Sequence, residues 1–192
     1  MRITSGDLRG RPIRTPPGEE TRPTSDRARQ AVFNILRHAP WSPGLDGLRV
    51  IDLFAGSGAM GLEALSQGAA SCLFVDTAAP ALSAIRDNIE AFKLDAAARV
   101  MRQDATRLGA RPPADPPYDL AFLDPPYGKD LGEAALATLR AGGWMGQDAV
   151  FVLERGAGEA AFPTQAYRLL DERRYGAATV LFLAFRRDAS AV

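Results

Sequence analysis

The sequence predicts an α/β fold with a mostly parallel sheet and an antiparallel last strand. From Leu48 onward, short apolar runs alternate with segments of helix length, a pattern typical of parallel strands joined by crossover helices. The final stretch, residues 167–187, shows no helical pattern and divides into two apolar runs at residues 175–178. Two strands joined by so short a turn must pair antiparallel.

The first 38 residues predict a short hairpin followed by a helix. Arg2–Ser5 and Pro12–Thr15 flank a turn at residues 6–10, which favours a hairpin. Thr24 or Ser25 can cap a helix that runs to His38. The apolar residues of this helix recur at helical spacing: Ala28, Ala31, Val32, Ile35 and Leu36.

The remaining elements follow in order along the chain. Apolar runs predict strands at residues 48–54, 71–76, 98–104, 118–124 and 149–155, and helices are expected at residues 61–68, 80–94 and 131–142. We divide the chain into a basic N-terminal arm, residues 1–40, and a main domain, residues 41–192.

Composition limits the possible function classes. With 192 residues, 46% of them hydrophobic, the chain can bury one core. Basic and acidic residues both number 23, so the net charge of zero gives no overall sign of a nucleic-acid partner. Residues 1–37, however, contain eight arginines and only four acidic residues. Positive charge is therefore concentrated at the N-terminal end.

Cysteine and histidine are too rare for several kinds of site. Cys72 and His38 are the only residues of their types, which excludes a disulfide within the chain, a histidine-dependent triad and a cysteine-based metal cluster. We therefore predict no metal. The sequence has no apolar span of about 18 residues and no signal-peptide pattern, so we expect a cytoplasmic protein without a membrane partner.

The segment Asp52–Gly61 carries a glycine-rich motif between a predicted strand and a predicted helix. Gly56, Gly58 and Gly61 match G-x-G-x-x-G, the spacing of dinucleotide-binding turns. Asp52 precedes the first glycine by four positions, where its carboxylate would face a ligand. A pyrophosphate favours the bare positive end of a helix, whereas the ammonium and sulfonium groups of S-adenosylmethionine attract a carboxylate. The motif therefore favours S-adenosylmethionine over a nicotinamide cofactor.

Two more acids follow neighbouring predicted strands. Asp76 ends the second strand and could accept hydrogen bonds from a pair of ribose hydroxyls. Asp104 ends the third and could lie beside an adenine amino group. A polar residue at a strand end is also a common turn former, so Asp104 alone is a weak signal.

The stretch AFLDPPYGK, residues 121–129, ends a strand on an acid. Pro125 and Pro126 cannot continue a strand ladder, so the carbonyls of Asp124 and Pro125 are available to a ligand. Tyr127 offers a flat face on which a base can stack. In an open α/β sheet this group would lie at the same edge as the glycine motif. The combination predicts binding of an exocyclic amino group beside a methyl donor.

With both motifs on residues 48–186, the chain resembles class I S-adenosylmethionine-dependent methyltransferases that modify nucleobase amino nitrogens. Adding the segments RITSGDLRGRPIRTP and TRPTSDRARQAVFNIL, nearly the whole chain resembles the bacterial small-subunit rRNA guanine-N2 methyltransferase family, the RsmD group that modifies guanine-966 of 16S rRNA. The resemblance implies a seven-stranded Rossmann-like sheet with a short N-terminal β-hairpin and helix. It also implies S-adenosylmethionine as donor and 16S rRNA, in the small ribosomal subunit or an assembly intermediate, as partner.

The resemblance assigns roles by position. It implies that residues 41–192 form the S-adenosylmethionine-binding catalytic domain, with Asp76 at the ribose and Asp104 at the adenine. The loop around the methionine half would consist of Asp52, Phe54, Ala55, Gly56, Ser57 and Gly58. The target guanine would be held by the catalytic residues Asp124, Pro125, Pro126 and Tyr127.

The basic arm predicts contacts with RNA phosphates. The candidates are Arg2, Arg9, Arg11, Arg14 and Arg22, with Lys129 near the site. The alternative for these arginines is a solvated face, or pairing with Glu19, Glu20 and Asp26.

The acid of the motif favours guanine. Guanine presents N1–H and N2–H donors side by side, which suits an acceptor-only carboxylate, whereas adenine presents an acceptor beside a donor. Similar motifs also occur in enzymes that resemble DNA adenine-N6 methyltransferases, so a DNA or other amino methyltransferase remains an alternative. A nicotinamide-dependent oxidoreductase and a catalytically silent binding module are the less favoured ones.

Overall fold

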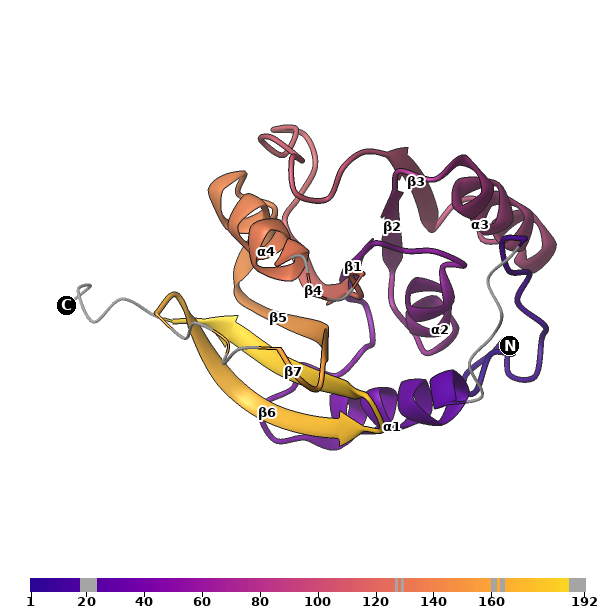
Figure 1. The fold of residues 1–192 in the computed structure, drawn as a ribbon. Helices are drawn as coiled ribbons and strands as arrows, with labels where there is room; N and C mark the ends of the chain where they lie inside the picture. The colour runs from indigo at the N-terminus through magenta and orange to yellow at the C-terminus, as the bar shows by residue number, and fades with distance from the viewer. Residues whose placement is uncertain (18–23, 127, 129, 160–161, 163–164, 187–192) are drawn as a thin grey trace.

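The centre of the protein is a seven-stranded sheet with helices on both faces (Figure 1). The computed structural model describes residues 1–17, 24–126, 128, 130–159, 162 and 165–186. The helices there are α1 (Thr24–His38), α2 (Ala59–Ser66), α3 (Ala79–Phe92) and α4 (Leu131–Ala141). The strands are β1 (Arg49–Leu53), β2 (Ser71–Asp76), β3 (Ala98–Arg102), β4 (Tyr118–Leu123), β5 (Met145–Gly156), β6 (Tyr167–Tyr175) and β7 (Ala178–Phe185).

The strand order is β3–β2–β1–β4–β5–β7–β6. The first five of these strands are parallel neighbours, and β7 pairs antiparallel with both β5 and β6. The C-terminal hairpin thus places its second strand against the main sheet. The predicted α/β fold, with a mostly parallel sheet and an antiparallel last strand, is confirmed.

Each face of the sheet has its own apolar core. Alternate residues of a strand point to opposite faces, so Val50 lies in one core and Ile51 in the other. α1, α2 and α3 cover the first face, where Phe33 of α1 packs on Phe122 of β4 with ring centroids 5.5 Å apart. α4 covers the second face. α1, the helix predicted before the main sheet, therefore packs in the core on the first face of that sheet.

The predicted N-terminal hairpin is a short antiparallel pairing. Arg2 and Pro12 form an isolated bridge, and the Ile13 amide donates to the Met1 carbonyl at 3.1 Å. Ile3 and Ile13 are buried in the core that contains α1 and α2. This hairpin is therefore packed against the main sheet's helices rather than extended away from them.

Two predicted strands differ from the observed ones by more than one residue at an end. β3 ends at Arg102, because Asp104 turns back on Thr106 and its carboxylate accepts the Thr106 amide at 2.8 Å. β5 begins at Met145, four residues before the predicted start. Residues 146–148 of β5 are not apolar, so the apolar pattern did not indicate this first part of the strand.

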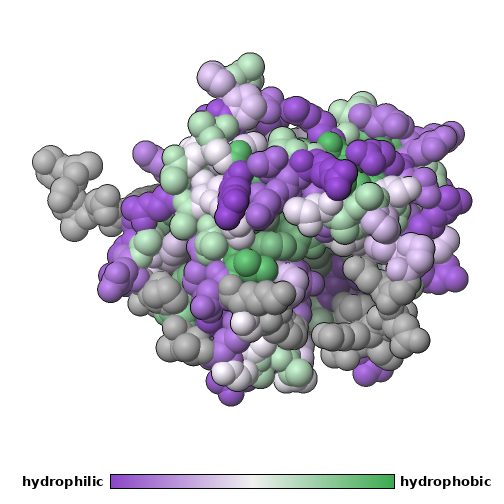
Figure 2. All heavy atoms as spheres, turned by 45° about the horizontal axis from the view of Figure 1, so that its top comes forward, coloured by the Kyte–Doolittle hydropathy of each residue, from purple (hydrophilic) through white to green (hydrophobic). Residues whose placement is uncertain are grey.

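The outer surface is largely hydrophilic. Figure 2 shows hydrophilic side chains over most of one face, with hydrophobic ones gathered near its middle. Among the described residues, Leu169 on β6 is the only large hydrophobic side chain classed as exposed. Most large apolar side chains of the described residues are thus buried or partly buried around the two cores.

Candidate active site

The carboxyl ends of three neighbouring strands meet at one edge of the sheet. β1 lies between β2 and β4, and its last residue, Leu53, is in register with Val75 of β2 and Leu123 of β4. The residues that follow these three strands are therefore close together. The chain runs from β1 outward through β2 to β3 and then returns to β4 on the other side of β1. The strand order therefore reverses between β1 and β4, which is the point where open α/β sheets bind ligands.

The glycine loop, residues 54–58, has a constrained backbone. Phe54 has φ +59°, a left-handed conformation that is rare for a bulky residue and is concentrated at functional sites. Gly58 has φ +76° and directly precedes α2. The Gly56 amide donates to the Asp76 carboxylate at 2.9 Å, which fixes the loop to the end of β2. The other two loop residues are buried: Ala55 and Ser57.

The third glycine of the motif lets α2 approach the sheet. A Cβ atom on Gly61 would lie 2.3 Å from the Phe74 ring and 2.6 Å from the Cys72 sulfur. Both distances are far below van der Waals contact, and both neighbours are buried on β2. Gly61 therefore sets how closely α2, and the loop before it, lie against β2.

Asp52 is buried at the base of the glycine loop. Its side chain accepts the Gly61 amide at 2.9 Å, so it is attached to the first turn of α2. Burial raises the pKa of Asp52 from 3.8 to about 8; the Gly61 hydrogen bond opposes this, and the charges of Asp124 and Asp76 add to it. A cation placed beside the loop would favour the ionised carboxylate.

We expect Asp52 to make folding less favourable as the pH rises from about 4 to about 8. Its carboxyl ionises near 3.8 in the unfolded chain but keeps its proton to about 8 in the folded one. Over this interval the free energy of unfolding falls by at most about 1.4 kcal/mol per pH unit. Asp52→Asn keeps an acceptor for Gly61 without titrating, so urea unfolding should show a flatter pH dependence. Equal slopes for variant and wild type would contradict this.

Asp76 and Asp104 are held differently. The Asp76 carboxylate accepts the amides of Gly56 at 2.9 Å and Ala78 at 2.8 Å, and the residue is only half-buried. Asp104 is exposed, and its bonds from the Thr106 hydroxyl and amide lower its pKa. The Asp76 carboxylate thus holds the backbone of the glycine loop, whereas the Asp104 carboxylate bonds to Thr106 within its own turn.

The acid and prolines of the second motif directly follow β4. β4 ends at Leu123, so Asp124 is the first residue past the sheet; it is exposed, as is Pro126, whereas Pro125 is buried. The structure brings Asp124 to the same edge as Asp52, and their charges interact. Tyr127 and Lys129 lie outside the described residues.

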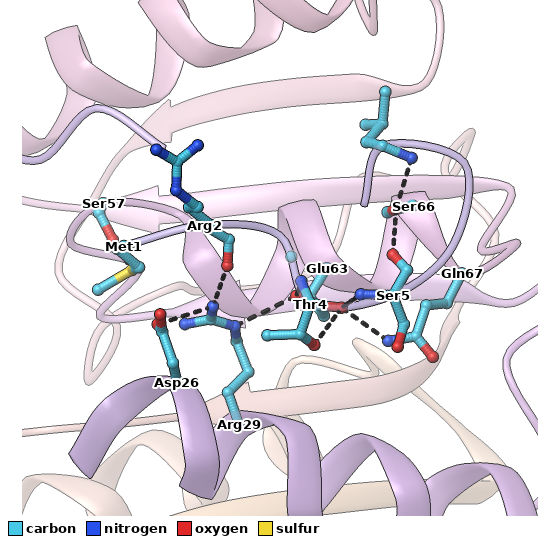
Figure 3. A network of polar contacts seen from close by, with 12 residues as sticks. Met1, Arg2, Thr4, Ser5, Asp26, Arg29, Ser57, Glu63, Ser66 and Gln67 are labelled. Atoms are coloured by element: carbon cyan, nitrogen blue, oxygen red, sulfur yellow. Dashed lines mark hydrogen bonds and ion pairs between the residues drawn. The ribbon is translucent and has the colours of Figure 1, made fainter. Parts of the chain in front are cut away.

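Glu63 of α2 anchors the N-terminal arm (Figure 3). This fully buried carboxylate accepts the amides of Thr4 at 2.8 Å and Ser5 at 2.9 Å, and the Thr4 hydroxyl at 2.8 Å. Arg29 of α1 forms an ion pair with it at 3.2 Å and also donates to the Arg2 carbonyl. One side chain therefore joins two parts of the arm, the N-terminal hairpin and α1, to the helix that follows the glycine loop.

Asn88 of α3 makes a second connection. Its side-chain carbonyl accepts the Arg14 amide at 2.8 Å, and its amino group donates to the Arg14 carbonyl at 3.0 Å. The same amino group lies 3.3 Å from the Ser57 carbonyl. The arm and the glycine loop thus share one buried amide.

The predicted RNA-binding arginines lie on the outer side of the arm. Arg2, Arg9, Arg11 and Arg14 are exposed. Arg11 donates to the Ala91 carbonyl at 2.7 Å and lies over the Phe92 ring, and Arg14 pairs with Asp87 at 3.3 Å. Arg22 lies outside the described residues. Exposed pairs of this kind contribute little stability, so these guanidinium groups can exchange partners readily.

Sequence reasoning assigned no role to Arg29, Glu63 or Asn88. The sequence did contain a signal for Glu63 and Asn88, namely a polar residue among apolar ones. Asn88 falls on the apolar face of α3 beside Ile85 and Ile89, and Glu63 stands within an apolar run. A polar residue on a buried helical face requires partners, but the sequence does not identify them.

Neither a metal-ligand cluster nor a membrane-spanning helix is found in the described part of the chain. No cluster of three or more histidine, cysteine, aspartate or glutamate residues there could hold a metal ion. Among the described helices, none combines the length and apolar character needed to cross a membrane.

Comparison with known proteins gives consistent matches along the chain. The family model described as Conserved hypothetical protein 95 matches residues 1–184. YlbH of Bacillus subtilis (strain 168), named as a proposed rRNA methyltransferase, is 41% identical over 140 residues, covering 72% of this chain and 73% of that protein. Ribosomal RNA small subunit methyltransferase D of Escherichia coli (strain K12) is 31% identical over 189 residues, covering 98% and 91%.

A solved structure agrees in fold over almost the same length. The proposed methyltransferase yhhF from Escherichia coli superposes with a TM-score of 0.82 and 29% identity, over 97% of this chain and 98% of that chain. The similarity thus includes the N-terminal arm as well as the sheet.

Proposed function

The chain belongs to the family described as Conserved hypothetical protein 95 and is a class I S-adenosylmethionine-dependent methyltransferase, and from this premise we propose its substrate. We propose that it methylates the exocyclic N2 of a guanine, guanine-966, in 16S rRNA of the small ribosomal subunit or an assembly intermediate. Relatives named as rRNA methyltransferases support ribosomal RNA as the substrate class.

One observation carries the proposal: the two motifs lie on adjacent strands in register. Leu53 of β1 pairs with Leu123 of β4, so the glycine loop and Asp124–Pro126 both begin one residue past the sheet. A group bound by Asp124 would therefore lie next to a ligand bound by the glycine loop. This arrangement suits direct transfer between two bound molecules.

The residues at the glycine loop fit S-adenosylmethionine. Asp52 is buried with a raised pKa, and a nearby ammonium or sulfonium would restore its charge. Gly56 and Gly58 allow close approach of a ligand to the backbone. Asp76, half-buried beside them, retains acceptor capacity for ribose hydroxyls. We propose that Phe54, Ala55 and Ser57 complete this loop, and that Asp104 lies at the adenine side.

The chain's own part in the chemistry is to orient an amino nitrogen. Bound S-adenosylmethionine supplies an electrophilic methyl group. The Asp124 carboxylate and the Pro125 carbonyl accept the two N2 hydrogens of guanine, which turns the nitrogen lone pair toward the donor and stabilises its developing positive charge. Asp124, or water, then receives the released proton. Pro126 holds the loop backbone extended, and Tyr127 stacks on the base.

The N-terminal arm supplies the RNA contacts in this proposal. The exposed arginines of residues 1–14 would neutralise phosphates, together with Arg22 and Lys129. Such contacts position the RNA without reading its sequence. Residues 1–40 thus act as the RNA-binding part and residues 41–192 as the catalytic part, in the cytoplasm where ribosomal subunits assemble.

The proposal is tested by methyl transfer to defined substrates. We expect labelled S-adenosylmethionine to methylate small subunits that lack the modification, with mass mapping placing the methyl group on N2 of guanine-966. Duplex DNA and adenine-containing oligonucleotides should remain unlabelled. Transfer to duplex DNA but not to ribosomal particles would favour a DNA methyltransferase. Binding of NADH without binding of S-adenosylhomocysteine would favour an oxidoreductase.

A further inference from the structure

β5 extends beyond the end of β4, alongside the second motif. Leu123 of β4 pairs with Leu153 of β5, and β5 then continues to Gly156 along β7. Arg155 therefore lies two residues past the last β4–β5 pair. Because side chains alternate along a strand, it shares the α4 face with Leu153.

Arg155 is buried and joins two carboxylates from different segments. Its guanidinium lies 3.0 Å from the Glu133 carboxylate in the first turn of α4. It also lies 3.1 Å from the carboxylate of Glu159, which follows β5. The arginine is 9% exposed, and such a shielded ion pair loses less strength to solvent than a surface pair.

Glu159 makes a further contact, with the backbone of the second motif. Its other carboxylate oxygen accepts the Gly128 amide at 3.1 Å. Gly128 has φ +76°, and Asp130, which precedes α4, has φ +49°. Glycine adopts this conformation without strain, but a non-glycine residue such as Asp130 keeps it only where surrounding contacts hold it. The Glu159 carboxylate thus connects Gly128, in the loop after β4, to the segment that follows β5.

We propose that Glu159 is a positioning residue for the target-base motif: by accepting the Gly128 amide while paired with Arg155, it fixes the backbone at Gly128, two residues past Pro126. Arg155 links this support to α4 through Glu133, so Gly128 is connected through Glu159 and Arg155 to the first turn of α4. The effect on methylation rests on the proposed function, whereas the effect on the loop backbone does not. Glu159 touches neither substrate nor cofactor in this proposal.

The test compares Glu159→Ala, which removes the acceptor, with Glu159→Gln, which keeps one. Glu172→Ala is the control, because Glu172 is an exposed carboxylate on β6 that pairs only loosely with Arg174 at 3.7 Å. For Glu159→Ala we expect amide exchange at Gly128 to speed up at least about tenfold, measured by NMR. Glu159→Gln should restore most of the protection, and Glu172→Ala should leave it unchanged.

Kinetics then separate positioning from a general structural role. We expect Glu159→Ala to lower kcat on small subunits about tenfold, with the RNA KM and the dissociation constant of S-adenosylhomocysteine within about twofold of wild type. Glu159→Gln should recover most of kcat. Unchanged Gly128 exchange, or a parallel loss of cofactor binding and thermal stability, would overturn the proposal. If wild type does not methylate ribosomal particles, the substrate proposal fails, and Gly128 exchange alone decides the role of Glu159.

Discussion

Replacing Asp124 by alanine is expected to slow methyl transfer by about 10²–10³-fold, while S-adenosylhomocysteine still binds within about twofold of wild type. Asp124 is exposed directly after β4, so its removal opens no cavity in either core. Its proposed hydrogen bond to the guanine amino group strengthens as positive charge develops on nitrogen. The loss should therefore appear in the single-turnover rate at saturating RNA.

Two variants sharpen this test. Asp124→Asn keeps one acceptor but adds a donor that faces guanine N–H groups, so we expect a rate between those of wild type and Asp124→Ala. Both substitutions remove a charge that helps raise the pKa of Asp52, so the pKa of Asp52 should fall in each. Retention of more than about a tenth of wild-type activity by Asp124→Ala would contradict the assigned role.

The main sheet could be predicted from the sequence because its signals are local. Strands such as β4 are mostly apolar runs, and the helices between them show helical spacing. Parallel strands joined by crossovers have their carboxyl ends at the same edge of the sheet, although chain order alone does not make β1 and β4 neighbours. The meeting of the glycine loop and Asp124 at one edge could thus be anticipated, since both follow parallel strands.

The supports of the site could not be predicted, because they join residues distant in sequence. Glu159 meets Gly128 only because β5 continues beyond β4. Asn88 meets Arg14 and Ser57 only because the arm packs across α3 and the glycine loop. Asp52 could be assigned to the loop from its position, but the hydrogen bond from Gly61 and the burial that raises its pKa depend on how α2 packs.

Arg29→Ala is expected to give the largest loss of stability, about 3–5 kcal/mol, because it leaves the Glu63 carboxylate buried without its ion-pair partner. The Arg29 side chain is 3% exposed and the Glu63 side chain 0%. The substitution also removes donors to Asp26 and to the Arg2 carbonyl. Urea unfolding measures the loss, and amide exchange at Thr4 and Ser5 should rise because their acceptor is destabilised.

Arg37→Ala is the matched control for this effect. Arg37 is also an arginine of α1, and it donates to the side chain of Gln67, the residue after α2, at 2.8 Å, but it is exposed. Its removal should cost about 0–1 kcal/mol. Adding Glu63→Gln to Arg29→Ala removes the stranded charge, so the double variant should be more stable than Arg29→Ala alone. A double variant less stable by the sum of both single losses would show that the ion pair is not what holds the arm. The remaining bonds from Thr4 and Ser5 would then be its main anchor, and charge would matter less than backbone hydrogen bonding.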